Sequence, residues 1–263
     1  MNEVLPRVGL LQTEDRRLFS HQVGIEYQLA VWLPPSYASS GQRYPVIYAL
    51  DGDVFFGMAT ALLPAMSLLD RIPEMIIVGI GYNRSFAEWS KLRELDFKIP
   101  EVQDQPPDSH ADRFLAAMKH EIIPFIEANY RTDPGERTLY GYSSSGFFAV
   151  YALVNQPDLF RRYLAGSPDT DLSCPYLQTH DQKLASHESK TPIDLFLTIG
   201  DLEDGAMQSS LVKFNELVAT IQARSYSGLR LKTQIYAGEN HGAVGIALTF
   251  INGLRQFYST SKP

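Results

Sequence analysis

The sequence predicts an α/β fold in which helices cover both faces of a mostly parallel sheet. Two short apolar runs, 46–50 (VIYAL) and 75–80 (MIIVGI), have the continuous hydrophobic character of central parallel strands. Segments with strand and helix character then alternate through the second half of the chain, as a parallel sheet requires. Because the 263 residues contain no internal repeat and no Gly/Ser-rich linker, we expect one domain spanning 1–263.

The first half supplies the early strands and one long helix. The β-prone run 25–33 (IEYQLAVWL) is ended by Pro34 and Pro35, so we expect a strand there before those at 46–50 and 75–80. Between 112 and 130, apolar residues recur at helical spacing. This pattern predicts an amphipathic helix, with Pro124 as the place for a bend.

The second half is predicted to alternate regularly. A strand at 138–140 leads into the turn GYSSSG and then into a helix over 147–160. Strands at 195–199 and 231–236 enclose a helix with apolar residues from Leu211 to Ile221, and the last helix begins near Ala243. The polar stretch 169–190 has no strand pattern, so we expect it to form a lid or a pocket segment.

The GYSSSG turn is the first candidate for chemistry. A Gly-x-Ser-x-Gly turn between strand and helix holds its serine at a strained tip, and its small residues let strand and helix approach closely. With Ser143 at the centre, Gly141 fits and Ser145 replaces the second glycine. With Ser144 at the centre, Tyr142 would stand where a small residue is needed. We therefore predict Ser143 as the nucleophile; the alternative is a polar turn that caps the next helix.

A serine nucleophile needs a general base, normally histidine, and on the α/β-hydrolase fold the chain order is serine, acid, histidine. Three histidines follow Ser143. His180 and His187 lie in the polar stretch, whereas His241 lies between a predicted strand and the last helix. A loop from the sheet could present His241 to the serine, so we predict it as the base.

The acid is expected in the loop after strand 195–199. That loop contains Asp201, Glu203 and Asp204, and any of them could orient His241. We rank Glu203 first for its reach, then Asp201, then Asp204; the alternative is a solvated acidic turn.

Two backbone N–H groups should form the oxyanion hole. Ser144, directly after the nucleophile, supplies one, and the loop after 46–50 offers Gly52 and Asp53 for the other. An ordinary Asp-Gly turn is the alternative at 51–52. For substrate contacts we select the aromatic residues Tyr142 and Phe55, together with Arg93. Because segment 84–98 has four basic and three acidic residues, it is interpreted as a mixed, solvated face.

At this point the chain resembles the putative-esterase family of α/β hydrolases, which includes esterase D and the enterobactin and bacillibactin trilactone esterases. The likeness runs from about Glu26 to the last helix and rests on VWLPPSY, RYPVIYALDGD, RELDF, ADRFLAAMKHEIIPFIEANYRTD, GYSSSG, LFLTIGDLED and GENHG. The resemblance implies Ser143 as nucleophile, His241 as base and Glu203 as acid. It leaves open a Ser-His dyad, as in some siderophore esterases.

The chain departs from the family pattern in two places. Ser145 replaces a glycine of the turn, and DTDLSCPYLQ stands where relatives often carry tryptophans. Since the second departure falls where we expect the substrate pocket, the substrate of a relative is not transferred. The resemblance implies a serine esterase acting on a siderophore-type ester or another small ester.

Composition limits the partners. A net charge of −7 argues against nonspecific nucleic-acid binding, so a small-molecule ester is the expected partner. The chain begins without a signal-like apolar segment and has no run long enough to span a membrane, which favours a cytoplasmic location. The single cysteine, Cys174, cannot form an internal disulfide. Oligomeric state is left open, with a homodimer as one expectation.

The predicted mechanism is acyl transfer through Ser143 and His241, which requires no metal and no organic cofactor. The rival from another class is a noncatalytic binding protein that keeps the fold, and the altered turn at Ser145 favours it. Among enzymes, an acyltransferase or a thioesterase is the alternative.

Overall fold

A computed structural model describes residues 9–99, 110–188, 191–204 and 209–258. Within these residues, eight strands form one sheet with the order β1-β2-β4-β3-β5-β6-β7-β8. The strands are β1 (Thr13–Phe19), β2 (Glu26–Trp32), β3 (Tyr44–Ala49), β4 (Ile76–Gly81), β5 (Thr132–Tyr142), β6 (Arg162–Gly166), β7 (Ile193–Gly200) and β8 (Leu229–Tyr236). The β1–β2 and β2–β4 pairs are antiparallel, and all pairs from β4 to β8 are parallel.

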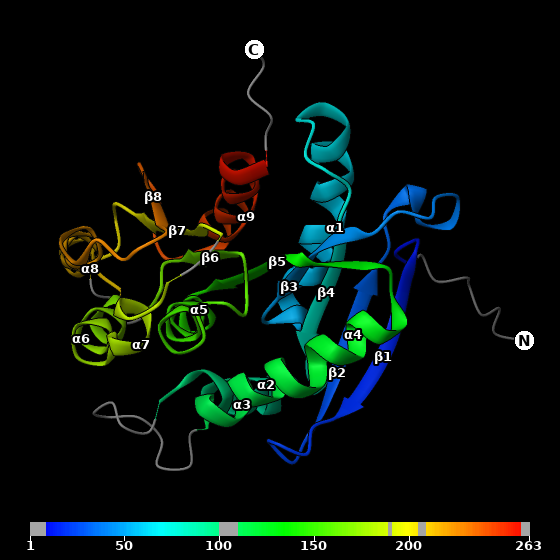
Figure 1. The fold of residues 1–263 in the computed structure, drawn as a ribbon, viewed down its shortest axis with the longest axis horizontal. Helices are drawn as coiled ribbons and strands as arrows, with labels where there is room; N and C mark the ends of the chain where they lie inside the picture. Colours follow the sequence, from blue (N-terminus) through cyan, green and yellow to red (C-terminus); the bar gives the residue numbers. More distant parts are fainter. Residues whose placement is uncertain (1–8, 100–109, 189–190, 205–208, 259–263) are drawn as a thin grey trace, which may run out of the picture.

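Helices cover both faces of this sheet (Figure 1). They are α1 (Gly52–Leu69), α2 (Phe86–Phe97), α3 (Ala111–Ala117), α4 (Ile123–Asn129), α5 (Ser144–Asn155), α6 (Thr170–His180), α7 (Gln182–Ala185), α8 (Leu211–Arg224) and α9 (Ala243–Tyr258), with a 3-10 turn η1 (Pro35–Ala38). Helices α1 and α9 pack on one face around Phe56, Leu63 and Phe250. The other face carries a larger core that includes the buried sides of α3, α5, α6 and α8. The predicted α/β fold with a mostly parallel sheet is confirmed.

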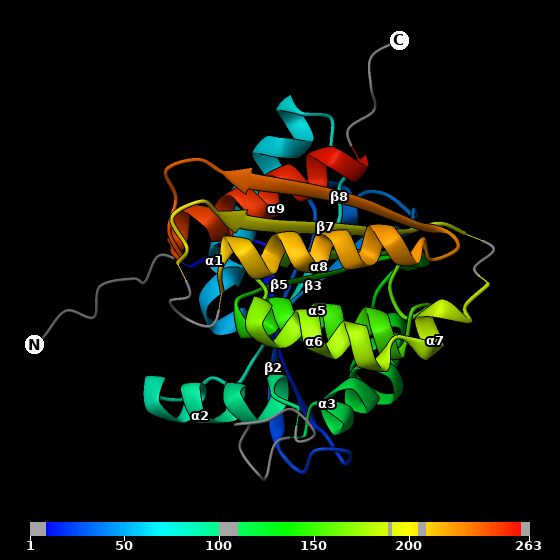
Figure 2. The same ribbon diagram turned by 90° about the vertical axis from the view of Figure 1, so that its left-hand side faces the viewer.

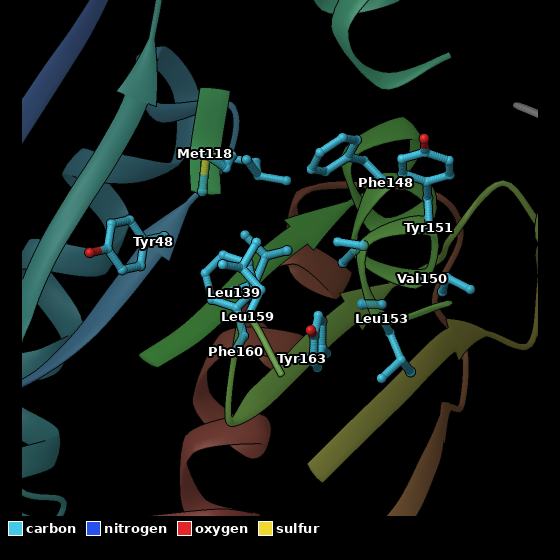
Figure 3. Close-up of a cluster of buried hydrophobic side chains, with 14 of the residues drawn as sticks. Tyr48, Met118, Leu139, Phe148, Val150, Tyr151, Leu153, Leu159, Phe160 and Tyr163 are labelled. Atoms are coloured by element: carbon cyan, nitrogen blue, oxygen red, sulfur yellow. The ribbon is translucent and has the colours of Figure 1, made fainter. Parts of the chain in front are cut away.

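Helix α5 is central to the second core. All its residues from Ser144 to Val154 are buried, and Figure 3 shows Phe148 and Leu153 among the side chains of this core, with Leu139 of β5 in the same cluster. Because α5 begins at the predicted nucleophile turn, this packing fixes the position of the turn. The continuous run FFAVYALV is therefore core, as expected for a helix buried on all sides.

The expected helix over 112–130 is interrupted. A π-helical segment, η2 (Met118–Ile122), separates α3 from α4, so the irregularity precedes Pro124 rather than starting at it. Proline lacks the N–H for an α-helical bond and its ring would clash with the carbonyl four residues earlier. A wider π turn just before Pro124 accommodates both effects.

Segment 169–190 is mainly helical within the part that the structure describes. Helix α6 packs against α5 and α8, and α7 packs against α5, so this segment completes the helical layer (Figure 2). Its role as a lid or pocket segment stays a prediction, as does the single domain over 1–263. Residues 189–190 lie outside the described part.

Candidate active site

Ser143 stands at the junction of β5 and α5 in a strained backbone conformation. Its φ of 63° and ψ of −128° lie where non-glycine residues are rare, at a cost of about 1–3 kcal/mol. The N–H of Ser143 donates to the carbonyl of Gly166 at 2.9 Å, which ties the tip to β6. This is the geometry expected of a nucleophile turn.

Two glycines allow the close approach of strand and helix. A Cβ at Gly141 would lie 2.2 Å from the carbonyl oxygen of Ser145, and one at Gly146 would lie 2.5 Å from that of Gly166. Both distances are far inside van der Waals contact. The sequence pattern placed the second tight position at 145, and the structure places it at Gly146.

Ser145, the residue in the glycine position of the motif, is fully buried and hydrogen bonded. Its hydroxyl donates to Asp51 Oδ2 at 2.8 Å and accepts from the N–H of Tyr142 at 2.9 Å. Asp51 Oδ1 also accepts from Arg93 Nε at 2.8 Å. The hydroxyl therefore links the nucleophile turn to the loop after β3.

Ser144 is equally engaged. Its hydroxyl donates to Asp169 Oδ2 at 3.1 Å, and Lys98 Nζ lies 3.0 Å from the same oxygen. The backbone N–H of Ser144 is in the first turn of α5, where helical N–H groups have no intrahelical acceptor. These contacts favour Ser143 over its two neighbours, and they leave the N–H of Ser144 suited to stabilise an oxyanion.

His241 and Glu203 form a close pair at the edge of the cavity. His241 Nδ1 lies 2.8 Å from Glu203 Oε2, and the Glu203 side chain is buried. Glu203 Oε1 accepts from the hydroxyl of Ser167 and from the N–H of Gly200 at 3.0 Å. The carboxylate is thus held from three directions and fixes the orientation of the imidazole.

Those hydrogen bonds govern the ionisation of Glu203. Burial alone would raise its pKa, but the hydrogen bonds from His241, Ser167 and Gly200 outweigh burial and leave the pKa lowered. Glu203 is therefore a carboxylate at neutral pH, and it can stabilise an imidazolium that forms on its partner.

The other predicted candidates for acid and base are held elsewhere. Asp201 accepts from the N–H of Gly238 at 2.7 Å, and Asp204 pairs through its backbone with Ser210. His180 stacks on Tyr176 with ring centroids 4.4 Å apart, and His187 lies 3.1 Å from Asp158. Among the described residues, Glu203 is the carboxylate that contacts His241.

A cavity of about 330 Å³ opens over Ser143 and His241. Three of the predicted residues line it: Tyr142, Phe55 and Arg93. The Tyr142 ring lies 5.2 Å from the His241 ring, and burial is the main cause that raises the pKa of Tyr142 to about 12, so its phenol stays protonated at neutral pH. The remaining lining residues are Asp51, Val54, Phe86, Trp89, Gly242, Ala243 and Ile246.

The loop after β3 differs in detail from the expectation. Asp51, which is not among the predicted site residues, lines the cavity in a left-handed conformation with φ of 51°. Gly52 packs against β4, where a Cβ would lie 2.5 Å from the carbonyl carbon of Gly79. The Asp53 carboxylate accepts from the N–H of Tyr82 at 2.7 Å. Gly52 and Asp53 are not among the residues lining the cavity, and their part in an oxyanion hole stays a prediction.

The described residues can also be examined for metal-binding groups and for helices of membrane-spanning length. They contain no group of three or more His, Cys, Asp or Glu side chains that could hold a metal ion. Helix α1 is the one described helix that is long and apolar enough to cross a membrane by length and composition. A core helix meets the same criteria, and α1 packs against β4 and α9.

A family model described as Putative esterase matches residues 20–243. The ferri-bacillibactin esterase BesA of Bacillus subtilis is 29% identical over 250 residues, covering 88% of this chain and 85% of BesA. A siderophore enterobactin esterase of Emericella nidulans is 31% identical over 160 residues, covering 54% of this chain and 53% of that protein.

Solved structures agree. The BES protein from Bacillus cereus superposes with a TM-score of 0.85 at 29% identity, covering 99% of this chain and all of that one. The siderophore hydrolase EstA from Aspergillus nidulans shares the fold, with a TM-score of 0.81 at 23% identity and coverage of 98% and 99%. With a family model that spans most of its length, the protein belongs to the Putative esterase family of ester-hydrolysing enzymes and has the α/β-hydrolase fold.

Proposed function

We propose that the protein hydrolyses a carboxylic ester of a small molecule through an acyl-enzyme on Ser143, with His241 as general base and Glu203 as its orienting acid. The observation that carries this proposal is the 2.8 Å contact between His241 Nδ1 and Glu203 Oε2 at the wall of the cavity that Ser143 lines. A carboxylate on Nδ1 leaves Nε2 as the nitrogen that accepts the serine proton.

The reaction has two halves. Ser143 Oγ attacks the ester carbonyl carbon while His241 Nε2 takes the serine proton, and the tetrahedral oxyanion is stabilised by the N–H of Ser144. The C–O bond to the alcohol then breaks, and His241 returns the proton to the leaving alkoxide. Water attacks the acyl-enzyme by the same route, which releases the carboxylic acid and restores Ser143.

The names of the relatives indicate which substrate to test first. Their names denote esterases of bacillibactin and enterobactin, so a siderophore-type ester is the first natural substrate to test on this chain. Transfer of the acyl group to an alcohol, and cleavage of a thioester, use the same residues and stay as alternatives.

Hydrolysis of 4-nitrophenyl acetate tests the residue roles. Ser143→Ala and His241→Ala should each lower kcat/KM by about a thousandfold or more, whereas His180→Ala should stay within about twofold of the wild type because His180 lies outside the cavity. Glu203→Gln separates a triad from a dyad: a triad predicts a loss of about a hundredfold or more in kcat. Full activity of Ser143→Ala, or an inactive wild type, would sink the proposal.

A further inference from the structure

We infer that the cavity selects esters that place an uncharged, preferably aromatic, group beside the scissile bond and discriminates against anionic ones. This inference rests on the proposed function of Ser143, because it assigns the substrate class of the same site. Among siderophore-type esters it favours those that present an uncharged ring to the cavity.

The cavity wall is mainly apolar. Val54 and Phe55 come from α1, Phe86 and Trp89 from α2, and Ile246 from α9. A volume of about 330 Å³ is at the lower end of small-molecule sites, which fall within roughly 300–1,000 Å³. Such a space suits one ring or a short apolar chain next to the reacting carbonyl.

The α2 side of the cavity offers a ring surface. Phe86 and Trp89 stack with centroids 5.3 Å apart and an interplanar angle of 29°. Phe86 is 79% exposed, which is unusual for a phenylalanine. Val54 is 53% exposed. A substrate ring that covers these side chains would remove apolar surface from water, which is the main driving force for apolar binding.

The charge in and below the cavity does not favour anions. Arg93 is the one Lys or Arg among the described lining residues, and its Nε lies 2.8 Å from Asp51 Oδ1. Its guanidinium also lies 5.4 Å from the centre of the Trp89 ring. The positive charge of Arg93 is thus already balanced by a buried carboxylate before any substrate enters.

Around the nucleophile turn, the buried carboxylates outnumber the cations that pair with them. Asp51, Asp169 and Glu203 are buried around the nucleophile turn, and the cations that pair with them there are Arg93 and Lys98. Three carboxylates therefore stand against two cations at this turn, and the whole chain carries −7. An anionic substrate would lose hydration on entry without gaining a free cation.

Three chromogenic esters test the inference: 4-nitrophenyl acetate, 4-nitrophenyl 3-phenylpropanoate, and the analogue of the latter with a para-carboxylate on its ring. We expect kcat/KM for the neutral aromatic ester to exceed that for the carboxylate by about tenfold or more. Equal values, or a preference for the carboxylate, would overturn the inference while leaving the proposed function intact. Failure of the wild type to cleave any of the three would instead overturn the proposed function.

Two pairs of variants test which side chains cause the substrate preference. Phe86→Ala should lower the ratio of kcat/KM for the aromatic ester to that for the acetate by about fivefold. Phe19→Ala removes a 52% exposed ring on β1 and should leave the ratio unchanged. An unchanged ratio in Phe86→Ala would overturn the assignment of the ring surface.

The second pair of variants tests the effect of charge, and both substitutions lie in α1. Val54→Lys adds a cation at the cavity wall, and Leu68→Lys adds one at the far end of α1, where Leu68 is 80% exposed. Val54→Lys should raise the relative kcat/KM for the carboxylate ester by about threefold at low salt, and about 0.5 M NaCl should remove the gain because salt screens exposed charges. An equal gain in Leu68→Lys would contradict a local electrostatic cause.

Discussion

Ser145 shows how one residue can break a motif and keep its geometry. In the glycine position of the turn, its hydroxyl lies between Asp51 of the β3–α1 loop and the backbone of Tyr142. It therefore joins the two chain segments from which the predicted oxyanion N–H groups come. The serine that departs from the glycine of the motif thus stabilises the site through these hydrogen bonds.

The hydrogen bonds of Ser145 predict a measurable cost. Ser145→Ala should leave Asp51 short of a donor and lower the free energy of unfolding by about 1–3 kcal/mol. Because these bonds hold the nucleophile turn against the loop after β3, kcat should fall as well. Urea unfolding and steady-state kinetics measure the two effects.

Ser186→Ala is the matched control, since that hydroxyl donates to the carbonyl of Lys183 on the exposed surface. It should change neither stability nor kcat by a measurable amount. A Ser145→Ala variant that behaves like this control would show that the Ser145 bonds contribute nothing.

At the scale of the element, β5 and α5 can approach closely at their junction because glycine there has no side chain. Gly146→Ala would place a Cβ 2.5 Å from the carbonyl oxygen of Gly166, and such overpacking costs about 1–3 kcal/mol. Gly57→Ala in α1 meets nothing within 4 Å and should stabilise the helix by about 0.5–1 kcal/mol. Thermal unfolding of both variants measures the contrast; equal shifts would contradict the tight junction.

Sequence patterns predicted some elements and missed others for identifiable reasons. The central strands β3 and β4 were recognisable because both faces are buried, so their residues are apolar throughout. Strand β1 was missed because it is a half-exposed edge strand with the charged sequence TEDRRLF. Strand β6 was missed because RYLAG is short and begins with Arg162, whose guanidinium pairs with Glu136 and Asp194.

The site was predictable only where a motif exists. Ser143, Glu203 and His241 follow a known order along the chain, and the structure brings Glu203 to His241. Asp51 and Phe86 carry no motif, because their positions depend on how α1 and α2 meet at the cavity. A local sequence pattern does not specify how two helices pack against each other. These two residues could therefore not be selected from the sequence.

At the scale of the whole molecule, buried tyrosines couple the fold to alkaline pH. Burial is the largest cause that raises the pKa of Tyr27, Tyr82 and Tyr140 well above 10.0. Tyr27 and Tyr82 both donate to Asp96 Oδ2, at 2.7 and 2.8 Å. The negative carboxylate disfavours the phenolate further.

The sign of the pH effect follows from those raised values. A group with a raised folded pKa binds its proton more tightly in the folded state, so its contribution is complete below the unfolded value and is lost as pH rises. The free energy of unfolding should therefore fall steadily as pH rises above 10.0, the ordinary tyrosine value. Urea titrations at several pH values, read beside phenolate absorbance, test this; full ionisation of the tyrosines with an unchanged free energy would contradict it.

Cytoplasmic location and a homodimer remain predictions from the sequence, and neither bears on the chemistry at Ser143. The proposed nucleophile is one oxygen atom, Ser143 Oγ, and covalent labelling tests it directly. After reaction with a fluorophosphonate, peptide mass spectrometry should locate a single phosphonyl group on Ser143, and Ser143→Ala should take up no label. A label on Ser144 or Ser145, or labelling that persists in Ser143→Ala, would contradict the account.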